Sequence, residues 1–338
     1  MWRDSSMSGA MKDEALSWLL SSEDPSVQWR VRTAVLGERQ DSPAMRALQE
    51  RIRRSARVRA ILGAAQGQRP YAMWRGPHWA LLSLAMLGYP RGDAQLFPLR
   101  NAVLDWWLAP RFQTDRDVAR ATKAEAREAV LRVDGRSRRC GSQHGGALLA
   151  IMRLGIDDGR AATLAQRLRD WQWPDGGWNC DIRPATAMSS VNETLLPMRG
   201  LQAFADTAGD TAAAGAAIAA AEVFLTRRVA WRRTSGQPIA RDVMKLHYPV
   251  YWHYDILAGL VGLAEVGLAR DQRCSDALDH LLSLRRPDGG WGVDASHWRV
   301  AERGRDIESV SWGPVSRRAS NEWVTCEVLS VLKAADRI

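Results

Sequence analysis

The hydrophobic positions along the chain alternate between two kinds of helical segment. Segments of the first kind are apolar on nearly all faces, which predicts burial on all sides. They cover residues 27–37, 78–88, 144–155, 194–209, 254–267 and 321–336. Alternating runs of β-branched residues are nearly absent, while Ala, Leu and Arg are frequent. The pattern therefore predicts a chain built almost entirely of helices.

Glycine follows the apolar part of five of these six segments, at Gly37, Gly88, Gly155, Gly209 and Gly267. Because glycine adopts positive φ without a steric cost, it commonly ends helices. The five glycines recur at intervals of roughly 50 to 70 residues, and such a period is typical of stacked helical repeats. We therefore expect each of them to end a helix.

Segments of the second kind are rich in arginine and carry one apolar stripe. They cover residues 11–22, 42–62, 97–108, 159–173, 211–228 and 274–286. A helix with one apolar stripe covers a more buried helix. Six inner and six outer helices in alternation predict an all-α fold, a single (α/α)6 toroid that forms one domain over residues 1–338.

The pentapeptide Pro-Asp-Gly-Gly-Trp occurs twice, at residues 174–178 and 287–291. Each copy follows an outer segment and precedes an inner one. Proline cannot continue a helix, and Asp-Gly-Gly favours a tight reversal of the chain. We expect Trp178 and Trp291 to pack against neighbouring helix ends and fix these turns.

The composition changes this picture only in part. The chain has 338 residues and a net charge of +9, and arginine supplies most of the 47 basic side chains. No nucleic-acid-binding motif accompanies this charge, so we expect no nucleic-acid partner, whereas an anionic ligand stays open. The N-terminus lacks an apolar secretory signal, and the four cysteines are scattered without a CxxC pair. These features predict a reduced, cytoplasmic protein.

Polar and aromatic residues gather at the starts of the inner segments. In a ring of parallel inner helices these starts share one end, where we expect a pocket. The predicted substrate-binding residues are Trp29, Arg30, Trp74, Arg75, Trp79, His144, Asn192, Tyr251, Trp252, Glu322 and Trp323. Tryptophan faces can stabilise a cation, and Arg30 and Arg75 can hold an anionic group such as a diphosphate.

Four residues at these starts are candidates for acid–base catalysis. Asp255 and Glu193, if buried among aromatic rings, would have a raised pKa and could donate a proton. His247 and His253 titrate near neutral pH when unperturbed. The segment around Asp255 holds two histidines, three tyrosines and a tryptophan between residues 247 and 255, more than a helix cap requires.

Helix capping and metal binding are alternative roles for some of these residues. Ser189, Ser190 and Asn192 resemble an N-cap, and Glu193 would complete a capping box. The side chains that could supply metal ligands are Cys140, His144, Cys180, Asp181, His247 and His253. Only the 140–144 pair has a helical spacing, with no second recognisable pair, so we predict neither a metal nor another cofactor.

The stretch RLRDWQWPDGGW (167–178), and more weakly LLSLRRPDGGW (281–291), resembles the QW-type repeat of the terpenoid cyclase and protein prenyltransferase superfamily. Squalene–hopene cyclases are its best-known members. The chain also resembles small bacterial proteins with this repeat, through DPSVQWR (24–30), QWPDGGWNCD (172–181) and KLHYPVYWHYD (245–255). The resemblance implies a helical toroid and an isoprenoid or other largely apolar substrate.

The chain departs from the superfamily in its catalytic motifs. It contains no DxDD, the acid of class II cyclases, and no DxC pair of the kind that holds zinc in prenyltransferases. We therefore expect a single-barrel, terpene cyclase-like enzyme that acts by acid–base chemistry on a small molecule, with prenyl diphosphates as candidates. A glycan-processing enzyme that pairs Glu193 with Asp255, and a non-catalytic ligand-binding barrel, are the alternatives. A peripheral membrane contact and the oligomeric state stay open.

Overall fold

The computed structural model describes residues 14–301 and 306–338, and they are mostly helical, as predicted. A helix lies in each predicted inner segment. The inner helices are α2 (Pro25–Arg30), continued by the π-helical turn η1 (Val31–Val35), α5 (Pro77–Leu87), α8 (Gly141–Leu154), α10 (Val191–Ala208), α12 (Ile256–Glu265) and α14 (Glu322–Ala334). Helix α5 shows why they belong inside, because nearly all of its side chains are buried.

The outer segments also form helices. These are α3 (Pro43–Arg53), α4 (Ala56–Ala65), α6 (Phe97–Trp107), α9 (Ala161–Asp170), α11 (Thr211–Leu225) and α13 (Ser275–Ser283). Residues 14–20 are helical as well, whereas the predicted start at 11–13 lies outside the described residues. The prediction of one helix over 42–62 is wrong, because the chain breaks at Arg54. The Ser55 side chain accepts a hydrogen bond from Val58 N (3.2 Å) and thereby caps a new helix.

Short single turns connect several of these helices. They are η2 (Ala94–Leu96), η3 (Pro110–Phe112), η4 (Asp242–Met244) and η5 (Gln272–Cys274). The predicted glycine ends are confirmed. The five glycines have φ values of +72°, +75°, +62°, +68° and +77° in chain order. This left-handed conformation lets the chain turn away after each of the first five inner helices.

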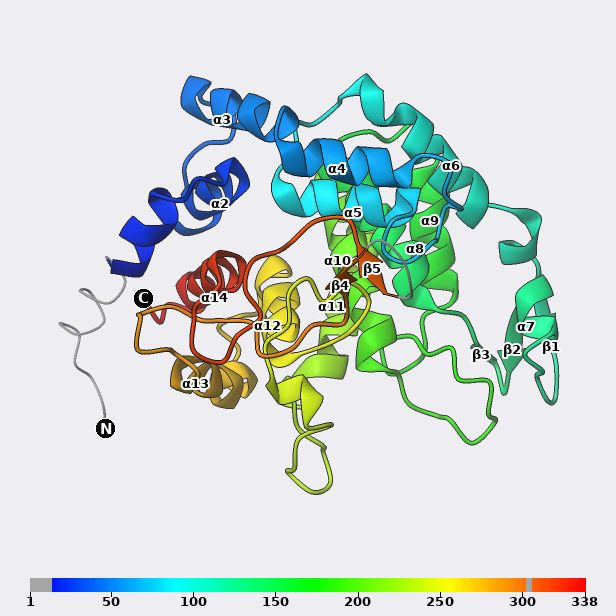
Figure 1. The fold of residues 1–338 in the computed structure, drawn as a ribbon. Coiled ribbons are helices and arrows are strands. Elements are labelled where there is room, and N and C mark those ends of the chain that lie inside the picture. The colour runs from blue at the N-terminus through cyan, green and yellow to red at the C-terminus, as the bar shows by residue number, and fades with distance from the viewer. Residues whose placement is uncertain (1–13, 302–305) are drawn as a thin grey trace.

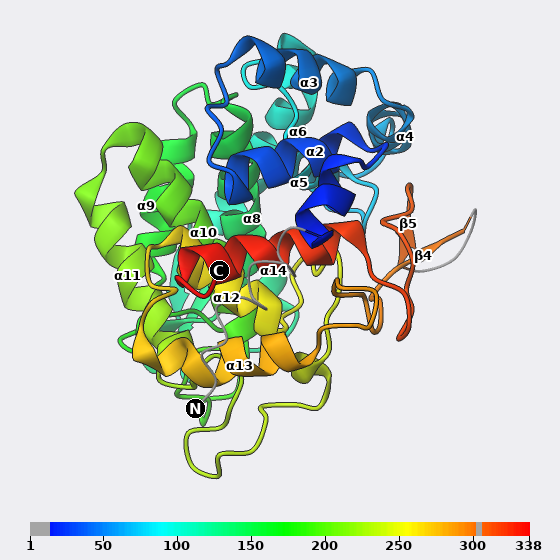
Figure 2. The ribbon, with the colours of Figure 1, turned by 90° about the vertical axis from the view of Figure 1, so that its left-hand side faces the viewer.

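Successive inner helices lie against one another: α2 contacts α5, α5 contacts α8, α8 contacts α10, α10 contacts α12 and α12 contacts α14. Helix α14 in turn contacts α2 and η1, so the two ends of the described helical chain meet (Figures 1 and 2). Each of α3, α6, α9, α11 and α13 packs on the inner helix that precedes it in the chain. This is the alternation of inner and outer helices that the hydrophobic pattern indicates.

Both Pro-Asp-Gly-Gly-Trp copies place their tryptophan at the end of an outer helix. Trp178 is buried and donates from its indole Nε1 to Leu168 O (2.9 Å), near the end of α9. Trp291 is buried and donates in the same way to Leu281 O (2.7 Å) in α13. The predicted role of the two indoles as joints of the fold is confirmed.

The aspartate of each copy binds a serine that lies two residues before an inner helix. Asp175 accepts hydrogen bonds from Ser189 N (2.8 Å) and Ser189 Oγ (2.6 Å). Asp288 makes the same contact with Ser320, accepting from its backbone N at 2.9 Å. The turn therefore links the end of an outer helix to the start of the inner helix that follows.

The weaker second copy lacks glutamine, but arginine replaces its contact. Gln172 Nε2 donates to Gly176 O (2.6 Å) in the first copy, and Arg285 Nε donates to Gly289 O (2.8 Å) in the second. Either side chain supplies the N–H group that the glycine carbonyl needs. The two turns are therefore equivalent in structure although their sequences differ before the proline.

Replacing either joint tryptophan by phenylalanine is expected to lower the free energy of unfolding by about 1–3 kcal/mol. The variants Trp178→Phe and Trp291→Phe each lose the indole hydrogen bond and leave a small cavity. Chemical denaturation followed by circular dichroism measures the effect. Trp18→Phe is the matched control, because Trp18 is 37% exposed. Equal stability of all three variants would contradict the role of the motif as a joint.

Two small sheets are the part of the fold that the helical pattern does not predict. Strands β1 (Asp115–Asp117), β2 (Val130–Val133) and β3 (Arg136–Ser137) form one sheet, which lies with α7 (Glu125–Glu128) at the periphery (Figure 1). Strands β4 (Arg299–Val300) and β5 (Ile307–Glu308) form the other. Asp134 and Gly135, with φ of +52° and +67°, turn β2 into β3. Asp-Gly is a frequent hairpin turn, so this signal was present in the sequence.

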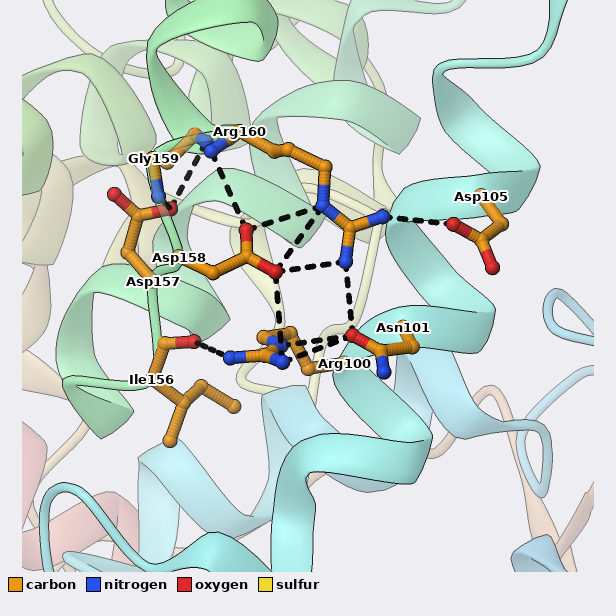
Figure 3. A network of polar contacts seen from close by, with 9 residues as sticks. Arg100, Asn101, Asp105, Ile156, Asp157, Asp158, Gly159 and Arg160 are labelled. Carbon is orange, nitrogen blue, oxygen red and sulfur yellow. Dashed lines mark hydrogen bonds and ion pairs between the residues drawn. The ribbon is translucent and has the colours of Figure 1, made fainter.

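A polar network ties the connection between α8 and α9 to α6 (Figure 3). Arg160 donates to Asp105 Oδ1 (2.7 Å) and Asn101 Oδ1 (2.8 Å), both on α6. Arg160 also pairs with Asp158 at 2.8 Å, and Arg100 donates to Ile156 O at 3.1 Å. These bonds orient the outer helices relative to one another.

Within residues 14–301 and 306–338, no helix has the length and apolarity needed to cross a membrane.

Candidate substrate cavity

A cavity lies among the inner helices. Its wide chamber has a volume of about 420 Å³ and is lined mainly by the C-terminal halves of the inner helices, together with Gly88 and Tyr89 just beyond α5. A narrow chamber of about 50 Å³ adjoins it and shares Arg30, Met86 and Val261 with its wall. All six inner helices line the narrow chamber, through Arg30, Leu82, Leu149, Leu196, Leu257 and Glu327 among others. The wide chamber falls in the size range of small-molecule sites.

Charged side chains from the inner helices meet where the two chambers join. Arg30 on α2 forms an ion pair with Glu327 on α14 and donates to Met86 O at 2.8 Å. Glu265 on α12 accepts from Arg153 on α8 (2.5 Å) and from two nitrogens of Arg199 on α10 (2.7 and 2.8 Å). Bidentate pairing fixes the guanidinium plane. The pairs thus connect α2 with α14, and α12 with both α8 and α10.

The arginines determine the charge of this cluster. Burial raises the pKa of Glu265, but the charges of Arg153 and Arg199 outweigh it and lower that pKa to about 2. Glu265 is therefore ionised at neutral pH. The wall of the wide chamber also includes Arg91, so arginines outnumber carboxylates there. This part of the cavity suits an anionic group.

The base of the narrow chamber holds a histidine–aspartate pair. Asp255 is fully buried and caps α12, accepting from Ala258 N at 2.8 Å. Its other oxygen accepts from His247 N (2.8 Å) and lies 3.2 Å from His247 Nδ1. Burial lowers the pKa of His247, but the hydrogen bond to Asp255 and the charges of Asp255 and Asp242 outweigh it, so the net shift is upward. His247 can therefore carry a proton near neutral pH.

Aromatic side chains gather near the starts of the inner helices, where the sequence predicts a pocket mouth. The Trp74 and Tyr251 rings stack with 4.4 Å between centroids and an 8° angle between planes. Trp79 packs edge-on against both, and all three side chains are buried. The expected position of the mouth is therefore wrong, since the wide chamber lies toward the C-terminal ends. Two tyrosines of the segment 246–255 contact helix starts: Tyr251 packs on Trp79 of α5, and Tyr248 stacks on Trp323 of α14.

The structure places five of the predicted site residues on the cavity wall. Trp29 and Arg30 line the wide chamber, while Tyr251, His247 and Asp255 line the narrow one. Trp252 and His253 stack on each other with 3.9 Å between centroids, at the same end as Trp74. The other predicted residues lie elsewhere.

His144 lies in the hydrophobic core. It is fully buried against Trp107, Phe112 and Trp171, and its Nε2 is 3.2 Å from Trp107 O. Burial lowers the pKa of His144 well below its usual value, so the ring is neutral. Its surroundings are those of a core residue.

Glu193 caps a neighbouring helix. Its Oε2 accepts from Ser142 N (3.1 Å) and Ser142 Oγ (2.8 Å), in the first turn of α8. The predicted capping box is therefore wrong: Ser190 begins α10 without a side-chain cap, and Ser189 binds Asp175 instead. Glu193 is not among the described residues that line either chamber.

The remaining predicted residues lie outside the cavity wall. Glu322 and Trp323, at the start of α14, line a separate surface pocket together with Asp24 and Arg57. Burial raises the pKa of Glu322. Arg75 and Asn192 are half-buried, and neither is among the described residues that line the two chambers.

Of the arginine and glutamate side chains that line the cavity, only Arg30 was predicted from the sequence. Arg153, Arg199, Glu265 and Glu327 lie in the middle or at the end of the inner helices, whereas the predicted site residues lie at or near their starts. The sequence did contain a signal for these four residues. A charged side chain in a helix that is otherwise buried on all sides needs a partner, which indicates a polar site.

Two groups of side chains in the described part of the chain could hold a metal ion. One consists of Asp242, His247 and His297, and the other of Cys140, Cys180 and Glu193. Of the six predicted ligand candidates, the structure brings Cys140 and Cys180 together. Asp181 instead pairs with Arg183 at 2.5 Å.

Comparison of the chain with protein-family models and with curated proteins finds no match.

Proposed function

We propose that the chain is a single (α/α)6 toroid whose central cavity binds a small amphiphilic substrate of the isoprenoid type. The toroid is supported by the contact of α14 with α2 and by the narrow chamber, to which every inner helix contributes. Closure of the inner helices on themselves accounts for both observations. The outer helices then cover the ring from outside.

The chemistry of the wall is the observation that carries the ligand class. Arg30, Arg91 and Arg153 in the wide chamber suit a diphosphate or another anionic head group. The narrow chamber beyond them is lined largely by aliphatic side chains, among them Leu82, Leu149 and Leu196, which suit an apolar group. An anionic head with an apolar tail matches both chambers at once.

The proposed reaction uses acid–base chemistry at the base of the narrow chamber. His247 is the proton donor. The Asp255 carboxylate contacts His247 Nδ1 and stabilises the protonated ring. His253 is a weaker candidate. Burial, followed by the charge of His297, lowers the pKa of His253 to about 4, so it is neutral at pH 7. Glycan processing by Glu193 and Asp255 requires both on one cavity, and only Asp255 lies there, so we do not propose it.

Binding of dimethylallyl diphosphate, whose single prenyl unit is nearest in size to the narrow chamber of about 50 Å³, tests the ligand class by isothermal titration calorimetry. We expect Arg153→Gln to weaken binding at least about 10-fold, because the variant removes one charged contact to the head group. Glu265 keeps its ion pair with Arg199 in this variant, so its carboxylate is not left without a charged partner. The matched control is Arg273→Gln, an exposed arginine paired with Glu222 on the outer surface. Equal affinity for dimethylallyl alcohol, or no effect of Arg153→Gln, would overturn the proposed head-group site.

Replacing His247 by asparagine tests the acid. We expect His247→Asn to lower the conversion of dimethylallyl diphosphate at least about 100-fold while its binding changes little. Asparagine can still donate a hydrogen bond to Asp255, so the cap of α12 is retained. His253→Asn serves as the control and is expected to stay active. Product analysis by gas chromatography measures turnover, and full activity of His247→Asn would exclude His247 as the donor.

A further inference from the structure

Three metal-ligating side chains meet outside the cavity, at the junction of α8, α10 and the first Pro-Asp-Gly-Gly-Trp turn. Cys140 immediately precedes α8, Cys180 follows the turn, and Glu193 lies in the first turn of α10. One donor atom from each lies within 4.8 Å of the other two. Cys180 Sγ is 3.4 Å from Glu193 Oε1. All three residues are half-buried, so solvent can reach the group.

Backbone contacts hold the two cysteine segments in place. Arg138 and Asn179 form a parallel β-bridge, which aligns the residues just before Cys140 with those just before Cys180. The Arg138 guanidinium donates to Thr186 O at 2.8 Å, in the loop that follows Cys180. The thiols are therefore positioned by the fold and not by chance contact of flexible side chains.

A second set of contacts orients the carboxylate. Glu193 Oε2 accepts both the Ser142 N–H and the Ser142 hydroxyl, which leaves Oε1 directed at Cys180. Carboxylate ligands of metal ions are commonly fixed in this way, with one oxygen bonded to the protein and the other free for the metal. The arrangement leaves Oε1 available as a ligand.

The spacing fits a tetrahedral zinc ion. Zn²⁺ binds sulfur at about 2.3 Å and carboxylate oxygen at about 2.0–2.2 Å, which places the two ligand atoms roughly 3.5 Å apart. The observed separation of Cys180 Sγ and Glu193 Oε1 is 3.4 Å. Thiolates favour Zn²⁺ over Mg²⁺ and Ca²⁺. Positive charge for the anionic ligands comes from Arg139, which interacts with all three, and from the N-termini of α8 and α10.

The second group of potential ligands is less suited to a metal. The His247 and His297 rings are stacked, with 4.4 Å between centroids and 17° between planes, so their in-plane lone pairs run nearly parallel and do not converge. Asp242, its third member, is exposed and pairs with Lys245 at 2.8 Å. The group of two cysteines and a glutamate has no such obstacle.

We propose that Cys140, Cys180 and Glu193 bind one Zn²⁺ ion, with a water molecule as the fourth ligand. Binding releases the two thiol protons to solvent and forms two Zn–S bonds and one Zn–O bond. The ion joins the starts of two adjacent inner helices to the turn between α9 and α10. This site is separate from the cavity, so it does not depend on the proposed function.

Metal content and cobalt spectra of the purified full-length protein test this site. We expect about one zinc ion per chain by elemental analysis, and less than a tenth of that in the double variant Cys140→Ser/Cys180→Ser. The control Cys274→Ser changes a buried thiol elsewhere and is expected to keep its zinc. In the wild type, Co²⁺ should produce a thiolate charge-transfer band and the strong visible absorption of tetrahedral cobalt.

A protection experiment on the wild type keeps the test valid if the double variant fails to fold. Zinc should slow the alkylation of Cys140 and Cys180 by iodoacetamide at least about 10-fold, measured by peptide mass spectrometry. Wild-type protein that neither contains zinc nor takes it up at micromolar concentration would overturn the proposal. So would full zinc content in the folded double variant, or a Cys140–Cys180 disulfide in protein purified without reductant but with zinc.

Discussion

Replacing Gly145 by alanine is expected to lower the free energy of unfolding by about 3 kcal/mol. A Cβ atom at this position of α8 would lie 2.3 Å from Pro197 N and 2.5 Å from Leu196 C, both backbone atoms of α10. Gly200 on α10 faces the same contact from the other side, where a Cβ would lie 2.6 Å from Gly145 O. Backbone cannot move aside as a flexible side chain can, so the two helices would have to separate.

The matched control for this variant is Gly215→Ala in α11. A Cβ atom at Gly215 meets nothing within 4 Å, and the residue lies within a helix. Alanine there should raise stability by about 0.5–1 kcal/mol, because it lowers the conformational entropy of the unfolded chain. Urea denaturation of both variants measures the difference. If Gly145→Ala were as stable as Gly215→Ala, α8 and α10 would not be in the close contact described.

Replacing Glu265 by glutamine is expected to cost about 3 kcal/mol of stability. The side chain neutralises both Arg153 and Arg199, and the variant leaves two guanidinium groups in the cavity wall without a charge partner. Glu265 is 25% exposed, so the effect lies at the lower end of the range for buried ion pairs. The control Glu222→Gln breaks an exposed pair with Arg273 and should change stability by less than about 0.5 kcal/mol.

The same carboxylate predicts how stability depends on pH. Its pKa is lowered from 4.5 to about 2 in the folded protein, so folding favours the ionised form. Its contribution is fully present above pH 4.5 and is lost as the pH falls toward 2. Thermal melts recorded between pH 4.5 and about pH 2 check this expectation. The melting temperatures of the wild type and Glu265→Gln should approach each other as the pH falls. A difference in melting temperature that does not change with pH would show that Glu265 is not held ionised by the arginines.

Much of the helical framework could be predicted from the sequence because its signals are local. Positive φ at Gly88 and Gly155 follows from the one residue type that adopts it without strain, and burial of Trp178 follows from its place after a tight turn. Errors arose where a local signal was overlooked, as at Ser55, which begins a new helix, and at Asp134, in a hairpin turn.

The candidate site could be predicted only in part. Asp255 and His247 line the narrow chamber, and both belong to a segment that its many aromatic residues had marked as unusual. Glu193 had an equally suggestive sequence context but faces Ser142 on the neighbouring helix. The direction of a side chain at a helix start depends on the helix beside it, and the sequence of one segment does not contain that information.

The sequence by itself determined which segments are helices, where most of them end and which are buried on all sides, since propensity, capping and hydrophobic period act over a few residues. Only the tertiary structure decided at which end the cavity is wide and which charges face it. Arg153, Arg199 and Glu265 come from three helices and are far apart in the chain. Their pairing arises because burial makes an unpaired charge too costly to keep, and packing decides which partners are in reach.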